Sequence, residues 1–288
     1  MEVFPEYFYR YRSADTWHFW EEVEQAISSS KIWLSQLTAQ NDPFEARPCR
    51  ERSSIADIRL FLRDFSRITG GKFATSGRPL SDFMVGSGAS KAKVRKQLGP
   101  TMEGAVFHRE TAFAAFEAVR GATLIASFSE VCDSLLMWSH YTSSHKGICL
   151  EYQMDDFGMY VGGVGFARLD YADVRPVVTT VDALNYIGHQ NFDGLPCFDS
   201  ARARKTFDDS LLTKSSDWSY EKEWRLCSSG DELPGYRIIP GLKVSAIYIG
   251  ANSSRDVEEK ITAAFGSNLP IYKMMIDKRE YKLVPRSL

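Results

Sequence analysis

Cysteine is scarce in this sequence and is not arranged in pairs. The 288 residues hold five cysteines, an odd number, and no Cys-x-x-Cys spacing occurs among them. This pattern argues against a disulfide-stabilised scaffold and against a four-cysteine zinc site, because both need paired or clustered thiols. We therefore expect reduced thiols and a cytoplasmic protein. The five are Cys49, Cys132, Cys149, Cys197 and Cys227.

Long apolar runs and phosphate-loop motifs are also missing. No window reaches the roughly 20 apolar residues of a membrane-spanning helix, and the start, MEVFPEYFYRYRS, lacks the apolar core of a secretory leader. The glycine-rich stretch VGGVG at 161–165 has neither the GxGxxG spacing nor the GxxxxGK(S/T) pattern. We expect no membrane partner and no phosphate loop there.

Charge is nearly balanced over the whole chain but unevenly placed. Residues 46–120 hold fourteen Lys and Arg against seven Asp and Glu, which gives them a net charge of +7. Because the whole chain has a net charge of −2, the other residues together carry −9. A basic module on an acidic body predicts an anionic partner such as RNA or DNA. A solvated face of surface helices would give the same composition. The most concentrated basic residues are Lys91, Lys93, Arg95 and Lys96.

The spacing of apolar residues predicts one α+β domain over residues 1–288, with a mixed, largely antiparallel sheet. Residues 46–120 read as a helical insertion between the first strands and a central one. The expected strands are 8–12, 32–34, 124–128, 148–152, 168–178, 218–226, 244–250, 271–276 and 281–284. The expected helices are about 15–27, 54–69, 102–119, 200–212 and 253–265.

The stretch 124–152, LIASFSEVCDSLLMWSHYTSSHKGICLEY, is the centre around which the chain is organised. It begins and ends with apolar strands, and Ser127 and Ser129 lie where the first strand ends. Between the strands, Trp138, His140 and Tyr141 combine aromatic and polar character. This order of a strand, a polar and aromatic crossover and a second strand predicts the floor of a pocket. An amphipathic helix joining two core strands would have the same pattern.

Three separated pieces of sequence share one chemical logic. They are Arg10 and Arg12 on the first strand, Ser127-Phe128-Ser129 and Glu221-Lys222-Glu223. A guanidinium holds phosphate in a bidentate fork. A serine hydroxyl orients a carboxylate, and a carboxylate near a ribose stabilises an oxocarbenium-like centre.

This order resembles the Arg–Ser–Glu signature of the mono-ADP-ribosyltransferases. The resemblance implies NAD as substrate, no metal, and a cleft in a split antiparallel sheet. It implies a catalytic role for Glu223 with Glu221 as first member of the pair, and Ser127 as the serine that orients the nicotinamide ribose. Arg12, or Arg10, would hold the dinucleotide, with Ser129 nearby. Trp138, His140 and Tyr141 would line the nicotinamide side.

Two features leave the assignment open. Phe128 stands where those transferases commonly carry threonine, and Ser35, which ends the strand at 32–34, could be the second-strand serine instead. Asn41 and Asp42, in the turn Asn-Asp-Pro-Phe-Glu, either cap a helix or order a loop that binds the ligand.

Over nearly its full length the chain also resembles a large family of uncharacterised microbial proteins known as a domain of unknown function. That resemblance implies a role as toxin or effector in phage defence, with an antitoxin or another protein as a further partner. It rests on the stretches YRS (11–13), NDPFE (41–45), SFS (127–129), MWSHY (137–141), GICLEY (147–152) and YEKEWR (220–225).

Other chemistries fit less well. His140 and His145 are five residues apart, about 140° around a helix, which disfavours a shared metal with Cys149. A thiol–histidine pair would need Cys132 or Cys149 on an apolar strand to be reactive. A metal-dependent nuclease would want Glu-x-Lys, and Lys222 comes one place early. A non-catalytic recognition module, with 46–120 as its binding arm, stays open.

Overall fold

The computed structural model describes residues 4–54, 56–58, 60, 61, 63, 109–154, 160, 161, 164–191, 199–228 and 233–288. These residues form two compact units. Unit 1 comprises Met1–Ala39, Thr123–Tyr171 and Lys214–Leu288, and unit 2 comprises Gln40–Ala122 and Ala172–Thr213. Most of the expected insertion, including Lys91, Lys93, Arg95 and Lys96, lies outside the described residues, so the insertion stays a prediction.

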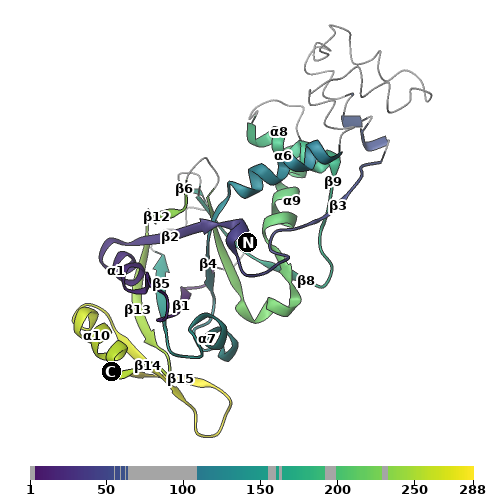
Figure 1. Ribbon diagram of the computed structural model, residues 1–288. Helices are drawn as coiled ribbons and strands as arrows, with labels where there is room; N and C mark the ends of the chain where they lie inside the picture. Colours follow the sequence, from purple (N-terminus) through teal and green to yellow (C-terminus); the bar gives the residue numbers. More distant parts are fainter. Residues whose placement is uncertain are drawn as a thin grey trace. The chain divides into compact units, whose positions relative to one another are not determined.

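Unit 1 is built on one large sheet (Figure 1). Its strands follow the order β15-β14-β13-β5-β1-β4-β11-β7-β6, and β2 pairs with both β4 and β12. Every pairing in this sheet is antiparallel except that of β13 with β14. The predicted mixed, largely antiparallel α+β fold is therefore confirmed. The strands are β1 (Tyr7–Arg12), β2 (Lys31–Gln36), β4 (Leu124–Ser129), β5 (Ile148–Met154), β6 (Tyr160–Val161), β7 (Val164–Arg168), β11 (Glu223–Ser228), β12 (Gly235–Ile238), β13 (Leu242–Ile249), β14 (Ile271–Ile276) and β15 (Leu283–Ser287).

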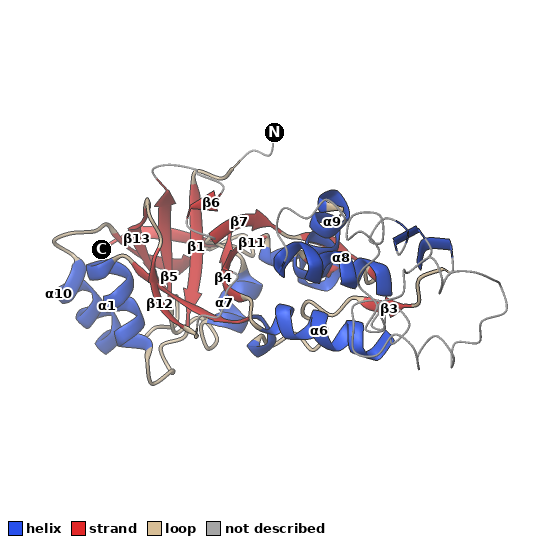
Figure 2. Ribbon diagram, turned by 90° about the horizontal axis from the view of Figure 1, so that it is seen from above, coloured by secondary structure: helices blue, strands red, loops and turns tan. Residues whose placement is uncertain are grey.

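One face of this sheet, called here the α1 face, carries the larger apolar core. Phe8, Phe128 and Trp224 from three neighbouring strands are buried there with Phe19 and Val23 of helix α1. Helices α1 (Phe19–Ser29) and α10 (Arg255–Phe265) lie side by side over this face (Figure 2). The N-cap Ser254 accepts a hydrogen bond from the backbone of Val257 at 3.3 Å and so fixes the start of α10.

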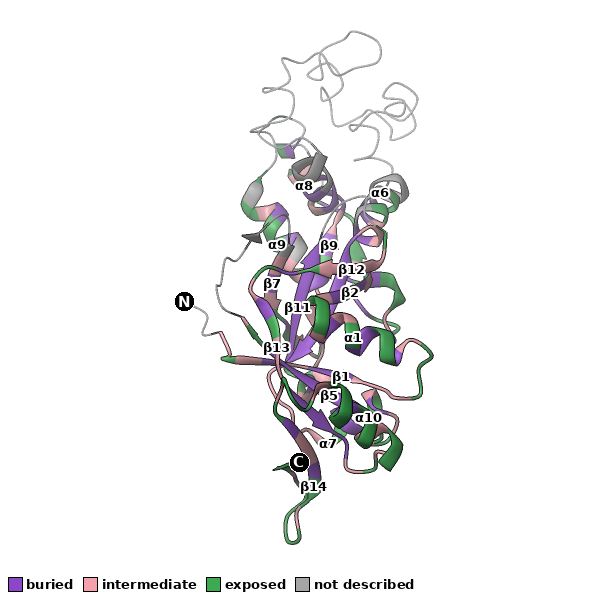
Figure 3. Ribbon diagram, turned by 90° about the vertical axis from the view of Figure 1, so that its left-hand side faces the viewer, coloured by how far each residue is buried: buried purple, intermediate pink, exposed green. Residues whose placement is uncertain are grey.

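The opposite face, called the α7 face, has a smaller core. Tyr11 and Cys149 pack there against Trp138 of helix α7 (Leu135–Tyr141). The Tyr11 and Trp138 rings meet edge to face, with centroids 5.3 Å apart. Because side chains alternate along each strand, the central strands β4, β5 and β11 bury residues on both faces. Figure 3 shows β5 and β11 coloured largely as buried.

Unit 2 has its own small core. Helices α6 (Arg109–Gly121), α8 (Thr180–Asn191) and α9 (Ser200–Leu211) accompany the parallel pair of β3 (Cys49–Glu51) and β9 (Val177–Thr179). Its buried cluster is Phe113, Phe116, Val178, Ala183 and Tyr186. Among the described helices of either unit, none is long and apolar enough to span a bilayer.

The predicted strand at 218–226 is wrong in its first half. Residues Ser216–Glu221 form the 3₁₀ helix η2, and β11 begins only at Glu223. Lys222 between them is left-handed, with φ of 44°. Ser215 opens the helix by accepting a hydrogen bond from the backbone N–H of Asp217 at 3.4 Å. The alternating aromatic and charged residues imitate a strand, although the backbone turns.

The turn after α7 crosses the end of β1 so closely that it requires glycine. A Cβ atom placed on Gly147 would lie 1.9 Å from the backbone oxygen of Arg12. We expect Gly147→Ala to lower the free energy of unfolding by about 3 kcal/mol or more, as overpacking against backbone does. Urea unfolding measures this. Gly121→Ala, with nothing within 4 Å of the added carbon, is the matched control, and equal losses in both variants would contradict the expectation.

Candidate active site

Four charged side chains, called here the buried ion cluster, meet on the α7 face where β11 begins. Lys214, Glu221, Glu223 and Arg225 are 7%, 4%, 3% and 1% exposed. The Lys214 ammonium lies 2.6 Å from Glu221 Oε2 and 3.1 Å from Glu223 Oε2. Arg225 donates to Glu223 Oε1 from Nε at 3.0 Å and from Nη2 at 2.9 Å. Two buried carboxylates thus share one lysine, and one of them also holds an arginine.

The backbone around this cluster is anchored by hydroxyl groups. Ser129 donates to the backbone oxygen of Glu221 at 2.6 Å and accepts from the backbone of Val131 at 3.2 Å. The hydroxyl oxygen of Tyr171 accepts from the backbone N–H of Glu223 at 2.8 Å. These bonds hold η2 against the end of β4. Ser129 therefore positions the main chain, because its hydroxyl makes hydrogen bonds with two backbone groups.

Ser127 lies beside one of the two carboxylates. On the paired strands β4 and β11, Ser127 lies opposite Arg225 and Ser129 opposite Glu223, so all four share the α7 face. Ser127 is among the groups that lower the pKa of the Glu223 carboxylate. The serine and glutamate of the expected trio are thus brought together.

The two carboxylates differ in protonation. Burial alone would raise the pKa of Glu223, but the charges of Arg225 and Lys214, with hydrogen bonds from Ser127 and Arg225, lower it to about 2. Burial raises the pKa of Glu221, and the Glu223 charge adds to that rise against the opposing effect of Lys214. Glu223 is therefore held as an anion, while Glu221 takes up a proton more readily. Two carboxylates whose pKa values are shifted in opposite directions suit two distinct roles in acid–base chemistry.

We expect Glu223 to make the fold sensitive to acid. Because its folded pKa of about 2 lies below the ordinary value of 4.5, its charge stabilises the fold above pH 4.5, and this contribution is lost as the pH falls toward 2. At neutral pH the contribution is about 3 kcal/mol. Urea unfolding of wild type and Glu223→Gln at several pH values measures it. The difference in free energy of unfolding between wild type and Glu223→Gln should shrink as the pH falls. A difference that does not change with pH would contradict the lowered pKa of Glu223.

Three polar aromatic residues form the exposed rim beside Glu221. The Tyr141 hydroxyl donates to Glu221 Oε1, and His140 Nδ1 lies 2.9 Å from the Tyr220 hydroxyl. His140 is exposed, and Tyr141 and Tyr220 are half-buried. Trp138, which we expected beside them, is fully buried instead, and its Nε1 donates to the backbone of Cys132 at 2.6 Å. The helical turn of α7 places it in the core.

Arg10 and Arg12 lie on the opposite face of the sheet. Tyr9 pairs with Ser129, so Tyr9 and Tyr11 share the α7 face, and the arginines between and after them point to the α1 face. Arg10 is stacked over Phe128 at 5.6 Å and donates to the backbone oxygen of Trp33 at 3.0 Å, while Arg12 pairs with Glu22 of α1. The expected convergence of arginine, serine and glutamate on one cleft is therefore not found.

The remaining candidate residues also make local contacts. Asp42, in unit 2, accepts from the backbone of Phe44 at 2.8 Å beside Asn41, as in a turn. Ser35 on β2 donates to the backbone oxygen of Ile125 at 3.5 Å. Cys149 is fully buried, and burial raises its pKa well above the ordinary value. Within the described part of the chain, no group of three His, Cys, Asp or Glu residues is placed to hold a metal ion.

A third buried carboxylate on the α7 face went unnoticed in the sequence. Glu151 accepts hydrogen bonds from Tyr248 at 2.7 Å, Ser245 at 2.7 Å and Tyr9 at 3.2 Å. Through the pairings of Tyr9 with Glu151 and with Ser129, it lies in one cross-strand row with Glu223. Three hydroxyl groups satisfy this carboxylate, so it stabilises the junction of β1, β5 and β13.

Lys214 and Arg225 are the site residues that sequence reasoning missed. Arg225 belongs to the stretch YEKEWR, and its place two residues after Glu223 on a strand could have predicted a shared face. Lys214 comes from β10 (Thr213–Ser215), seven residues before Glu221 in the chain. No periodicity links it to the glutamates.

Comparison with known proteins finds a family model that matches part of the chain, and it indicates no activity. Neither a curated protein nor a solved structure matches the chain. Residues 137–226 run from α7 into β11 and include the rim residues, Lys214 and both glutamates. This segment matches the family model described as a protein of unknown function (DUF2971), which confirms the resemblance to a domain of unknown function.

Proposed function

We propose that unit 1 cleaves NAD at its nicotinamide glycosidic bond and transfers the ADP-ribosyl group to a macromolecular acceptor. The observation that supports this proposal is the placement of Ser127 beside Glu223 on the neighbouring strands β4 and β11, where the serine helps to lower the pKa of the carboxylate. This placement is the one expected for the serine and glutamate of the transferase signature. The neighbouring Glu221, with its pKa shifted in the opposite direction, supplies a second functional carboxylate.

In the proposed reaction, the bond between ribose C1′ and the nicotinamide nitrogen breaks, and its electron pair leaves with nicotinamide. The Glu223 anion stabilises the positive charge that develops on the ribose. An acceptor nucleophile then bonds to C1′ and gives its proton to Glu221, whose raised pKa makes it a better proton acceptor than Glu223. The products are nicotinamide and an ADP-ribosylated acceptor.

The rim formed by His140, Tyr141 and Tyr220 is the side from which we expect NAD to approach. It is the exposed part of the site, and Tyr141 touches Glu221 directly. Aromatic rings there can stack on nicotinamide. Arg10 and Arg12 take no part in the proposed reaction, because both lie on the α1 face.

The acceptor and setting follow from composition and resemblance. The +7 surplus at 46–120 supports a nucleic-acid acceptor, because phosphate neutralisation supplies most sequence-independent affinity. A protein acceptor is the alternative. We further propose a cytoplasmic toxin or effector of phage defence that an antitoxin restrains.

A second candidate function is a non-catalytic binding module. It is favoured by the ion pairs within the buried ion cluster, in which Lys214 bridges both glutamates and Arg225 pairs with Glu223. A buried network of this kind also occurs where charges serve specificity of folding alone.

A pair of variants tests the proposal against this alternative. We expect Ser127→Ala to lower nicotinamide release by roughly tenfold to a hundredfold, the effect of losing a hydroxyl that stabilises a charged group. Arg12→Lys, on the opposite face, should leave the turnover per folded molecule near that of wild type. The measurement is nicotinamide released from NAD, with folding checked by circular dichroism. If both variants lose turnover equally, Ser127 has no specific role.

A further inference from the structure

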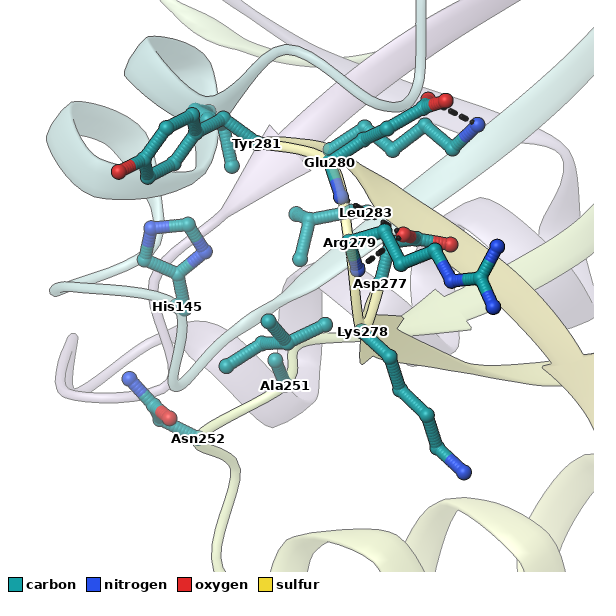
Figure 4. Close-up of a pocket in the computed structure, with 12 residues that line it drawn as sticks. His145, Ala251, Asn252, Asp277, Lys278, Arg279, Glu280, Tyr281 and Leu283 are labelled. Atoms are coloured by element: carbon teal, nitrogen blue, oxygen red, sulfur yellow. Dashed lines mark hydrogen bonds and ion pairs between the residues drawn. The ribbon is translucent and has the colours of Figure 1, made fainter.

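Unit 1 contains a pocket of about 450 Å³ that the proposed chemistry does not use. It lies between the start of α7, the turn after α7, the loop after β13 and the tip of the β14–β15 hairpin (Figure 4). None of the residues of the buried ion cluster lines it. Its volume is in the range of pockets that hold small ligands.

One side of the pocket is aromatic. His145 and Tyr281 lie near each other on that side (Figure 4). His145 is stacked with Trp138, with an interplanar angle of 10° and centroids 6.5 Å apart, and it also lines the pocket. Tyr281 is 100% exposed, which is unusual for a tyrosine without a partner ring. Two such rings can receive a flat heteroaromatic group.

The wall that carries His145 is held in a costly conformation. Ser143, Ser144 and His145 are all left-handed, with φ of 50°, 61° and 67°. Residues other than glycine rarely adopt this conformation, and then as single residues. Asn252 fixes the turn, donating from its backbone to His145 O at 2.9 Å and from Nδ2 to Ser144 O at 3.1 Å. The imidazole is thus positioned before any ligand binds.

His145 also has an unused polar atom. Its Nδ1 is buried and makes no hydrogen bond in the structure. Buried polar atoms are nearly always paired, and each exception needs an explanation. The imidazole is therefore held in place by the turn and not through Nδ1.

The other side of the pocket is cationic. The charged ends of Lys278 and Arg279 lie away from the two rings (Figure 4). Neither side chain forms an ion pair with any residue that the structure describes. The acids of the same hairpin tip are engaged, since Asp277 accepts from the backbone of Arg279 and Glu280 at 2.8 and 2.9 Å, and Glu280 pairs with Lys282. Two cations remain for an anionic ligand.

We propose that this pocket binds a mononucleotide, with the base against His145 and Tyr281 and the phosphate at Lys278 and Arg279. A ligand with a flat ring at one end and a phosphate at the other matches both sides of the pocket. The volume accommodates one nucleotide. The same chemistry is offered by a free nucleotide and by the phosphorylated end of a strand, and we commit to the free nucleotide.

Equilibrium binding of AMP tests this inference without any dependence on NAD cleavage, because AMP has no nicotinamide bond. We expect Tyr281→Ala to weaken AMP binding by about tenfold or more, as loss of base stacking does, and Tyr281→Phe to retain it. Lys278→Ala with Arg279→Ala should weaken binding and flatten its salt dependence. Lys260→Ala, an exposed lysine of α10 that does not line the pocket, is the control.

Four outcomes would overturn the inference. The first is absence of AMP binding to the wild-type chain, and the second is equal affinity in Tyr281→Ala. Another is that inorganic phosphate binds as tightly as AMP, since the aromatic side would then have no role. The last is that a short oligonucleotide with a 5′-phosphate binds much more tightly than AMP, which would assign the pocket to strand ends.

Discussion

Replacing Lys214 by methionine is expected to destabilise unit 1 by about 3–5 kcal/mol, the cost of leaving buried charges without a partner. Methionine keeps the length and apolar stem of lysine but removes its charge. Glu221 and Glu223 would then lie near each other inside the protein without the shared lysine, while Arg225 still pairs with Glu223. Chemical denaturation of the variant measures the loss.

The pH dependence of this loss separates charge from packing. In Lys214→Met, Glu221 should protonate at a higher pH than in wild type, because the cation that opposes its raised pKa is gone. The deficit should therefore shrink as the pH falls and Glu221 becomes neutral. Lys222→Met changes an exposed lysine next to the same glutamates and is the matched control. A loss of stability that equals that of Lys222→Met, or that does not change with pH, would contradict the electrostatic role assigned to the buried ion cluster.

Glu223→Gln is expected to reduce nicotinamide release from NAD by roughly two to three orders of magnitude, comparable to removing a main stabiliser of transition-state charge. Glutamine keeps the shape of the side chain but loses the anion that the fold maintains through Arg225, Lys214 and Ser127. The variant should also be less stable, because two buried cations lose part of their compensation. Turnover must therefore be expressed per folded molecule.

Glu221→Gln is the comparison that tests the division of roles. If Glu221 takes the acceptor's proton, this variant should lose transfer to the acceptor more than it loses the initial departure of nicotinamide. Free nicotinamide and modified acceptor are measured in the same reaction. Equal losses of both in the two variants would show that the carboxylates act as one structural unit.

The sequence predicted the strands of unit 1 well where apolar alternation or a continuous apolar run was clear. The run at Leu124–Phe128 and the alternation at Ile148–Tyr152 correspond to β4 and β5. Placement of Ser127 and Ser129 at the end of β4 followed from the same pattern. Side-chain alternation also holds for β11, where Glu223 and Arg225 share a face.

The face of the sheet on which a residue lies could not be predicted for β1. Tyr9 and Tyr11 alternate with Arg10 and Arg12, and the structure packs both sets against helices. A strand covered on both faces has no solvent side from which to orient the pattern. The sequence therefore did not show that Arg12 lies away from Ser127.

The turn before Glu223 could not be predicted because its key residue is not glycine. Lys222 adopts φ of 44° although a lysine rarely does so. Its backbone N–H bonds to Ser219 O at 3.3 Å, and its carbonyl accepts from Glu130 at 3.2 Å. The second contact joins segments more than 90 residues apart, as does the contact of Ser129 with Glu221. Tertiary contacts of this kind override local periodicity.

Incubation of the purified wild-type chain with NAD, with and without RNA, DNA and protein acceptors, tests the central claim most directly. We predict catalytic release of nicotinamide that Glu223→Gln lowers by roughly two to three orders of magnitude. With a suitable acceptor, we also predict attachment of ADP-ribose, detected as added mass. Absence of NAD consumption under all of these conditions, by a chain shown to be folded, would contradict the proposed activity and favour a non-catalytic binding module.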